Sequence, residues 1–120
     1  MNFDTYKKRQ ITFGSGGGFA NLVNEYRLLE NRKLYHKRGT DSLFAALDRK
    51  EATEVKLIFD KTRSLFEETK DFREPGNIYY FIRFKQDTIT NEIVWGGSKE
   101  NTPQKAKELY KELMNLVNLK

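Results

Sequence analysis

The sequence contains no cysteine, and His36 is the single histidine among its 120 residues. The absence of cysteine excludes a disulfide-stabilised scaffold and thiolate metal sites. One histidine excludes a multi-histidine metal centre, and no serine or aspartate is placed by a known motif to form a nucleophilic pair with it. We therefore expect no metal and no cofactor.

Long apolar runs are also missing from the chain. No stretch approaches the roughly 18 residues that a membrane-spanning helix needs, and the basic start is not followed by the apolar segment of a secretory signal. We therefore predict a cytoplasmic protein without a membrane span. Its length suits a single domain over residues 1–120, in which we expect residues 1–9 to form a flexible basic N-terminus.

The basic excess lies in the first part of the chain. Residues 1–50 hold ten Lys and Arg against five Asp and Glu, whereas residues 51–120 hold twelve of each, so the first part carries the whole net charge of +5. Such a patch attracts nucleic acid, an anionic lipid surface or an acidic protein, although lysine on edge strands also serves to prevent aggregation. The candidate nucleic-acid contacts are Lys7, Lys8, Arg9, Arg32, Lys33, Lys37 and Arg38.

The first half of the chain contains segments with the composition of strands. Residues 10–13 are mostly β-branched or aromatic, which predicts a short strand. Residues 22–30 and 33–38 flank a pair, Asn31 and Arg32, that indicates a two-residue hairpin. Apolar residues at helical spacing in 19–30 leave a helix open there as the alternative.

The second half contains a predicted pair of strands after a turn. Pro75 and Gly76 suit the second and third positions of a type II turn. The run 78–84, almost entirely apolar or aromatic, is typical of a central strand. A second strand is expected from Ile89 to Trp95, ending at Gly96 and Gly97.

Two segments have the apolar periodicity of amphipathic helices. Asp48 can cap the first, and Glu51 three residues later completes a capping box, which predicts a helix over 49–62 that can extend to Phe66. The second begins with Thr102 and Pro103 and has apolar residues at Ala106, Leu109, Tyr110, Leu113, Leu116 and Val117. Residues 42–47 fit either a helical turn or an extended segment.

This order of elements predicts an α+β fold. Its order is β-β-β-α-β-β-α, and an antiparallel sheet of four or five strands with two helices packed on one face buries both apolar helix faces. Either set of alternate residues in the strand after Pro75 can point to the helices.

A cluster of glycine follows the first predicted strand. Residues 14–18 hold four of the eight glycines. Glycine-rich loops after strands bind phosphate through backbone N–H groups, but Phe19 stands where the nucleotide-binding motifs need a lysine or a small residue. The segment is therefore either a bent connection that uses positive φ angles or a contact for a ligand or partner. Its candidate partner-binding residues are Gly14, Ser15, Gly16, Gly17, Gly18 and Phe19.

Trp95 is a further candidate partner-binding residue. It precedes Gly96 and Gly97 at a strand end, and tryptophan is enriched among the residues that dominate binding energy in protein interfaces. Aromatic residues at 79–81 also fit a platform for stacking bases, although most rings at strand positions belong to a core.

Several phrases of the sequence together resemble a family of small uncharacterised proteins from Bacteroidetes-type bacteria. The phrases are ITFGSGGGF at 11–19, EYRLLEN at 25–31, EPGNIYYFI at 74–82, VWG at 94–96 and LYKELM at 109–114. The resemblance implies a strand hairpin around residue 31. It implies no activity.

The residues contain no coherent catalytic set. The carboxylates at 67, 68, 71 and 74 are typical of a solvated helix end and loop. We therefore expect a small non-enzymatic module that contacts a protein or peptide through the glycine-rich segment and nearby aromatic residues. Nucleic-acid binding by the basic first 50 residues is the alternative, and a carboxylate-dependent enzyme is a further one. The sequence does not indicate an oligomeric state.

Overall fold

The computed structural model describes residues 2–19, 22–96 and 101–118 and has the predicted α+β class with two helices. Gly97 lies outside the described residues. The elements are, in chain order, β1 (Gln10–Gly17), β2 (Asn24–Leu29), β3 (Leu34–Arg38), β4 (Ala45–Ala46), α1 (Ala52–Glu68), β5 (Phe72–Glu74), β6 (Ile78–Gln86), β7 (Ile89–Gly96) and α2 (Gln104–Asn118).

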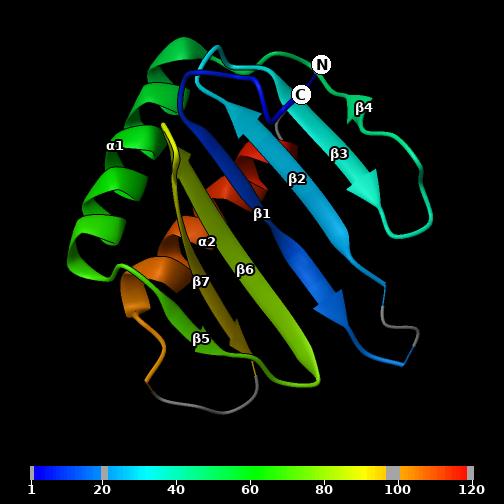
Figure 1. The fold of residues 1–120 in the computed structure, drawn as a ribbon, viewed down its shortest axis with the longest axis vertical. Helices are drawn as coiled ribbons and strands as arrows, with labels where there is room; N and C mark the ends of the chain where they lie inside the picture. Colours follow the sequence, from blue (N-terminus) through cyan, green and yellow to red (C-terminus); the bar gives the residue numbers. More distant parts are fainter. Residues whose placement is uncertain (1, 20–21, 97–100, 119–120) are drawn as a thin grey trace.

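The sheet is larger than predicted and is mixed. Its seven strands have the order β4-β3-β2-β1-β6-β7-β5 (Figure 1). Neighbouring strands are antiparallel except β5, which pairs parallel to β7. The two added strands have two and three residues, too few for an alternating pattern to identify them. β4 lies in the segment left open, and β5 replaces part of the predicted loop.

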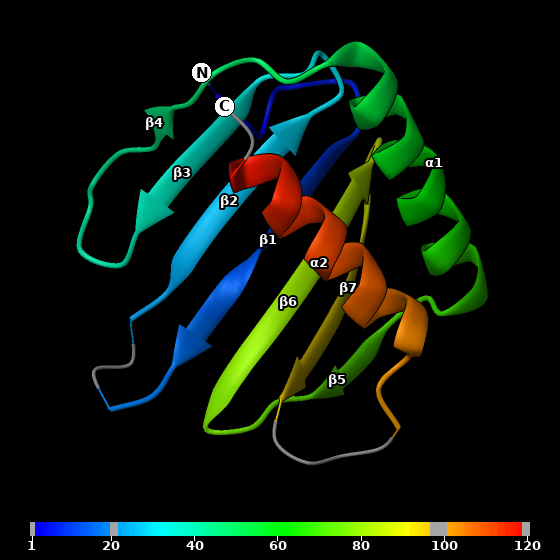
Figure 2. The same ribbon diagram turned by 180° about the vertical axis from the view of Figure 1, so that it is seen from behind.

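Both helices lie on one face of the sheet (Figure 2). Their apolar residues form one core cluster with alternate strand residues, which include Ile11 and Phe13 of β1 and Ile82 and Phe84 of β6. Because strand side chains alternate between faces, Phe81 and Arg83 point to the opposite face. No helix of the described chain covers that face (Figure 1).

The first helix begins later than predicted. Its N-cap is Glu51, whose carboxylate accepts a hydrogen bond of 2.8 Å from the backbone N–H of Glu54, so the prediction of Asp48 as the cap is wrong. The helix starts no earlier because the Glu51 backbone is extended (φ −69°, ψ 138°), and the Lys50 N–H before it donates to the Arg32 carbonyl in the β2–β3 connection. The helix ends at Glu68, beyond the predicted range.

The glycine-rich segment is mostly strand, not loop. β1 continues to Gly17 between β2 and β6, and positive φ angles occur at Gly17 (87°) and Gly18 (78°). Residues 24–29 form the strand β2, so the helical alternative for 19–30 is wrong. The β2–β3 connection is also longer than two residues: the Leu29 N–H donates to the Lys33 carbonyl, and Arg32 has a φ of 78°.

Candidate functional site

Glycine at alternate positions of β1 shapes the uncovered face of the sheet. Ile11 and Phe13 point to the helices, so Gly14 and Gly16 lie on the opposite face. Gly14 is paired with Glu25 on β2 and with Phe81 on β6. Because glycine has no side chain, β1 and β2 approach closely here, and the Asn24 oxygen stands where a Cβ atom of Gly14 would lie.

A groove of about 560 Å³ opens on the same face, over the end of β1 and over residues of β2, β5, β6 and β7. Its floor includes Phe81 and Val94, cross-strand partners that are buried on this face. The Tyr79 ring lies 6.4 Å from the Phe81 ring and directly over Gly16, where a Cβ atom would stand 2.5 Å from the tyrosine hydroxyl. The remaining lining residues are Gly17, Val23, Glu25, Arg73, Pro75, Gly76, Asn77, Arg83 and Glu92.

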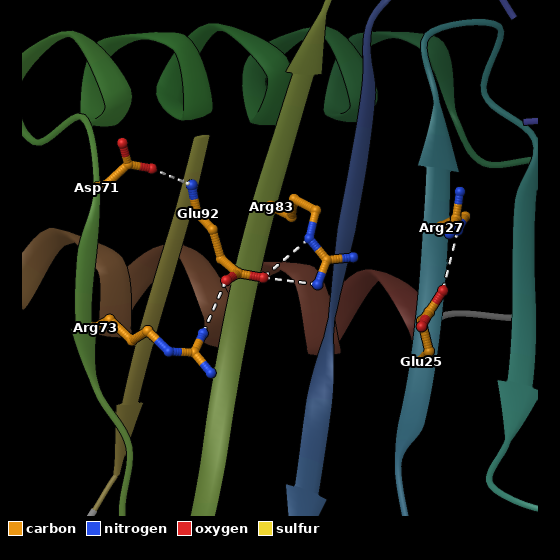
Figure 3. A network of polar contacts seen from close by, with 6 residues as sticks. All are labelled: Glu25, Arg27, Asp71, Arg73, Arg83 and Glu92. Atoms are coloured by element: carbon orange, nitrogen blue, oxygen red, sulfur yellow. Dashed lines mark hydrogen bonds and ion pairs between the residues drawn. The ribbon is translucent and has the colours of Figure 1, made fainter. Parts of the chain in front are cut away.

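A carboxylate held by two arginines forms one wall of the groove (Figure 3). Glu92 Oε2 accepts hydrogen bonds from Nε (2.9 Å) and Nη2 (2.6 Å) of Arg83, and its Oε1 accepts one of 3.1 Å from Nη1 of Arg73. The backbone N–H of Glu92 donates to the Asp71 carboxylate at 2.9 Å. This network connects β5, β6 and β7.

A second ion pair lies on the other side of the groove, on β2. Arg27 donates to the Glu25 carboxylate at 3.0 Å (Figure 3). The Arg27 guanidinium also lies 4.6 Å from the Phe3 ring centre and 5.2 Å from that of Phe44. Phe3 packs edge-on against Tyr35 as well. Phe3 and Phe44 therefore shield the part of this face over β2 and β3. The groove beside them stays open over β1, β6 and β7.

The structure places the predicted glycine-segment residues at or beside this groove. Gly17 lines it, and Gly14 and Gly16 pair with the lining residues Phe81 and Tyr79. Gly18 anchors the end of the segment by donating from its N–H to the Asn77 carbonyl at 2.9 Å, and Phe19 beyond it is fully exposed. Ser15 points to the helices, where it hydrogen bonds to Tyr110.

Trp95 is in the core and not on a binding surface. It is 7% exposed, and its ring packs 5.9 Å from Tyr80 and 5.4 Å from Tyr110 on the helix face. The prediction of Trp95 as a partner-binding residue is therefore wrong. Side chains alternate along β7, so Trp95 points to the core while its neighbours Val94 and Gly96 lie on the opposite face.

Burial in this aromatic cluster raises the pKa of Tyr110 to about 12. The unfolded chain therefore loses its phenolic proton at lower pH than the folded protein. We expect the free energy of unfolding to be unaffected by this group below about pH 10, and to fall by about 2 kcal/mol as the pH rises towards 12. Urea unfolding of the wild type and of Tyr110→Phe at rising alkaline pH measures this fall in the free energy of unfolding. A difference between the two proteins that does not change with pH contradicts the assignment.

The predicted basic residues do not converge on one surface. Arg9 donates to Glu30 at 3.0 Å and lies 5.2 Å from the Phe59 ring centre on α1, and this bond to Arg9 holds the pKa of Glu30 below its ordinary value. Lys37 lies over Phe44 on the opposite face. Lys7 and Lys8 are exposed in the segment that packs on the β2–β3 connection, which holds Arg32 and Lys33, whereas Arg38 is exposed at the far end of β3.

The carboxylates before the predicted turn separate in space. Glu67 pairs with Arg63, Glu68 with Lys105, and Asp71 with the Glu92 backbone. Within the described ranges, no three His, Asp or Glu side chains are placed to hold a metal ion, and no helix is long and apolar enough to cross a membrane. No protein-family model matches the chain, and no curated protein has significant sequence similarity to it.

Sequence reasoning missed Tyr79, Arg73, Arg83, Glu25 and Glu92 as members of this site. The signal that could have found the groove is the spacing of Gly14 and Gly16, two residues apart in a strand. The cross-strand neighbours of these glycines depend on register, which pairs β1 with strands distant in sequence.

Proposed function

We propose that this protein is a small binding module that takes an extended peptide segment of a partner protein on the uncovered face of its sheet. The observation that carries the proposal is the groove on this face, whose apolar floor of Phe81 and Val94 is bordered by Tyr79 and by charged side chains from β2, β5, β6 and β7. A groove with an apolar floor and a few polar groups at its walls is typical of ligand sites.

Exposed apolar side chains at one end of the groove support this proposal. Phe19 is fully exposed, and Ile78 and Leu22 are about half exposed. Val23 of the groove lining directly follows Leu22, whereas Ile78, beside Gly18, points with Ile82 to the helix face. Exposed apolar residues beside a binding groove are typical of interaction surfaces, and aromatic side chains contribute much of the energy of such contacts.

The two alternative functions have less support. Nucleic-acid binding needs a shared basic surface. Arg9 is paired with Glu30, and Lys37 and Arg38 lie at the opposite end of β3 from the other predicted contacts. A carboxylate-dependent enzyme needs a concave site with acidic side chains, and Glu25 and Glu92 do line the groove. Each of these carboxylates is bonded to arginine, an arrangement that suits positioning of charge more than proton transfer.

The test is selection of a library of short, N-acetylated and C-amidated peptides with immobilised protein, followed by anisotropy titration of the enriched sequences. We expect the wild type to enrich a peptide consensus. Tyr79→Ala and Phe19→Ala each weaken binding of that consensus by about tenfold, since each removes an aromatic contact worth one to two kcal/mol. A labelled single-stranded oligonucleotide in the same titration tests the nucleic-acid alternative, which requires affinity that falls steeply with salt.

Leu57→Ala is the matched control, because Leu57 is an exposed apolar residue on α1, in the helical layer. It should bind the consensus as the wild type does. The proposal is wrong if the wild type enriches no peptide, or if Tyr79→Ala and Phe19→Ala bind as tightly as Leu57→Ala.

A further inference from the structure

We infer that the peptide segment taken by the groove carries an acidic side chain, a carboxylate or a phosphate, which bonds to Arg83 and Arg73. This inference rests on the proposed function and specifies the chemistry of its ligand. It is carried by the charge of the uncovered face and by the hydrogen-bonding capacity of the two guanidinium groups.

Positive charge dominates the strand residues that point to the uncovered face. By alternation from the core residues, the cationic side chains on that face are Arg27, Lys37, Arg73, Arg83 and Lys85, and the anionic ones are Glu25 and Glu92. With the Asp71 carboxylate, which bonds to the Glu92 N–H, the face has five cations against three carboxylates, a net charge of 5 − 3 = +2. The groove lining itself has two arginines and two carboxylates, so the surplus comes from the cations around it. An acidic ligand is therefore attracted to this face.

The two guanidinium groups beside the groove have donors beyond those that Glu92 accepts. A guanidinium carries five N–H donors. In the described chain, the hydrogen bonds of Arg73 use Nη1, and those of Arg83 use Nε and Nη2. Figure 3 shows the third nitrogen of Arg83 turned away from Glu92 and towards β1. Each arginine can therefore bond to a second acid while it keeps its bond to Glu92.

Both guanidinium groups are accessible as well as held in place. The side chain of Arg83 is 37% exposed and that of Arg73 is 69% exposed. Glu92 fixes both of them at one wall of the groove, so little side-chain entropy is lost when a ligand binds. Arg83 pairs with Thr12 on β1 and itself lines the groove, so its guanidinium can be reached from the groove.

The apolar floor of the groove indicates which residue type lies near the acidic residue in the bound peptide. Phe81 and Val94 lie one pair further along β6 and β7 than Arg83 and Glu92 on the same face. In an extended peptide, side chains two residues apart share a face. An acidic residue and an apolar or aromatic residue two positions away can therefore contact the arginines and the floor together.

The experiment scans the peptides enriched by the full chain, with Asp, Glu, phosphoserine, Asn and Lys substituted at each position. The wild type should prefer the acidic residues at one position by about tenfold over Asn, as expected for a charge-assisted hydrogen bond. Arg83→Gln should abolish this preference, and Arg73→Gln should reduce it. Selection of phosphoserine over Asp and Glu identifies a phosphate ligand, and the reverse order identifies a carboxylate.

Arg63→Gln is the matched control, since Arg63 is an exposed arginine paired with Glu67 on α1. It should keep the full preference. Circular dichroism of each variant confirms that the fold is intact. If the wild type enriches peptides without preferring an acid, or if Arg83→Gln and Arg73→Gln both keep the preference, this inference is wrong while the proposed function stands. If the wild type enriches no peptide at all, the proposed function itself fails.

Discussion

Replacing Gly14 with alanine is expected to lower the free energy of unfolding by about 3 kcal/mol. A Cβ atom at this position would stand 1.9 Å from the backbone oxygen of Asn24. That oxygen belongs to β2, which pairs with β1 in the interior of the sheet, so neither strand can move without losing hydrogen bonds of the ladder. Urea unfolding followed by circular dichroism measures the change.

Gly39→Ala is the control for this substitution. Its Cβ atom would meet the side chain of Leu22, which is half exposed and can rotate away. We expect a change within about 0.5 kcal/mol. If Gly14→Ala is as stable as Gly39→Ala, the close approach between β1 and Asn24 does not exist in solution.

Replacing Phe59 with alanine is expected to lower the free energy of unfolding by about 3 to 5 kcal/mol. Phe59 is 1% exposed on α1, and its ring lies 6.4 Å from that of Phe84 on β6. The substitution leaves a cavity between the helix and the sheet. It also removes the aromatic ring under the Arg9 guanidinium, which adds to the loss.

Leu57→Ala on the same helix separates the effect of burial from that of helix composition. Leu57 is 53% exposed, so its loss should change the free energy of unfolding by about 0.5 kcal/mol or less. Thermal unfolding by calorimetry gives both values. Equal effects at positions 57 and 59 would show that the two residues do not differ in burial, and would contradict the placement of α1 on the sheet.

The sequence predicted those elements in which the apolar pattern repeats several times. The apolar positions of 106–117 repeat over about three helical turns, and the structure has a helix there. The run after Pro75 became a central strand, as its composition indicated. β4 and β5 escaped prediction because they depend on partners for their conformation: β5 forms where Phe72 and Glu74 meet β7.

The site was predicted less well than the fold. Gly14 and Gly16 were identified as candidate contacts, but as a loop, because glycine disfavours strands when it is judged by propensity alone. Their partners Tyr79 and Glu25 come from β6 and β2, and only the register makes them neighbours. Trp95 was misassigned for the same reason, since the face to which a strand residue points depends on pairing.

The ends of the sheet bear on how this molecule meets others. At one margin β4 has two residues, and at the other β5 has three. Beside β5, the backbone N–H of Glu92 donates to the Asp71 carboxylate. An added strand therefore cannot use this N–H as a donor. Short and occupied margins hinder lateral growth of a sheet into fibres. They also hinder a partner peptide from adding to the sheet as an eighth strand. A partner is therefore expected to contact side chains more than main-chain groups.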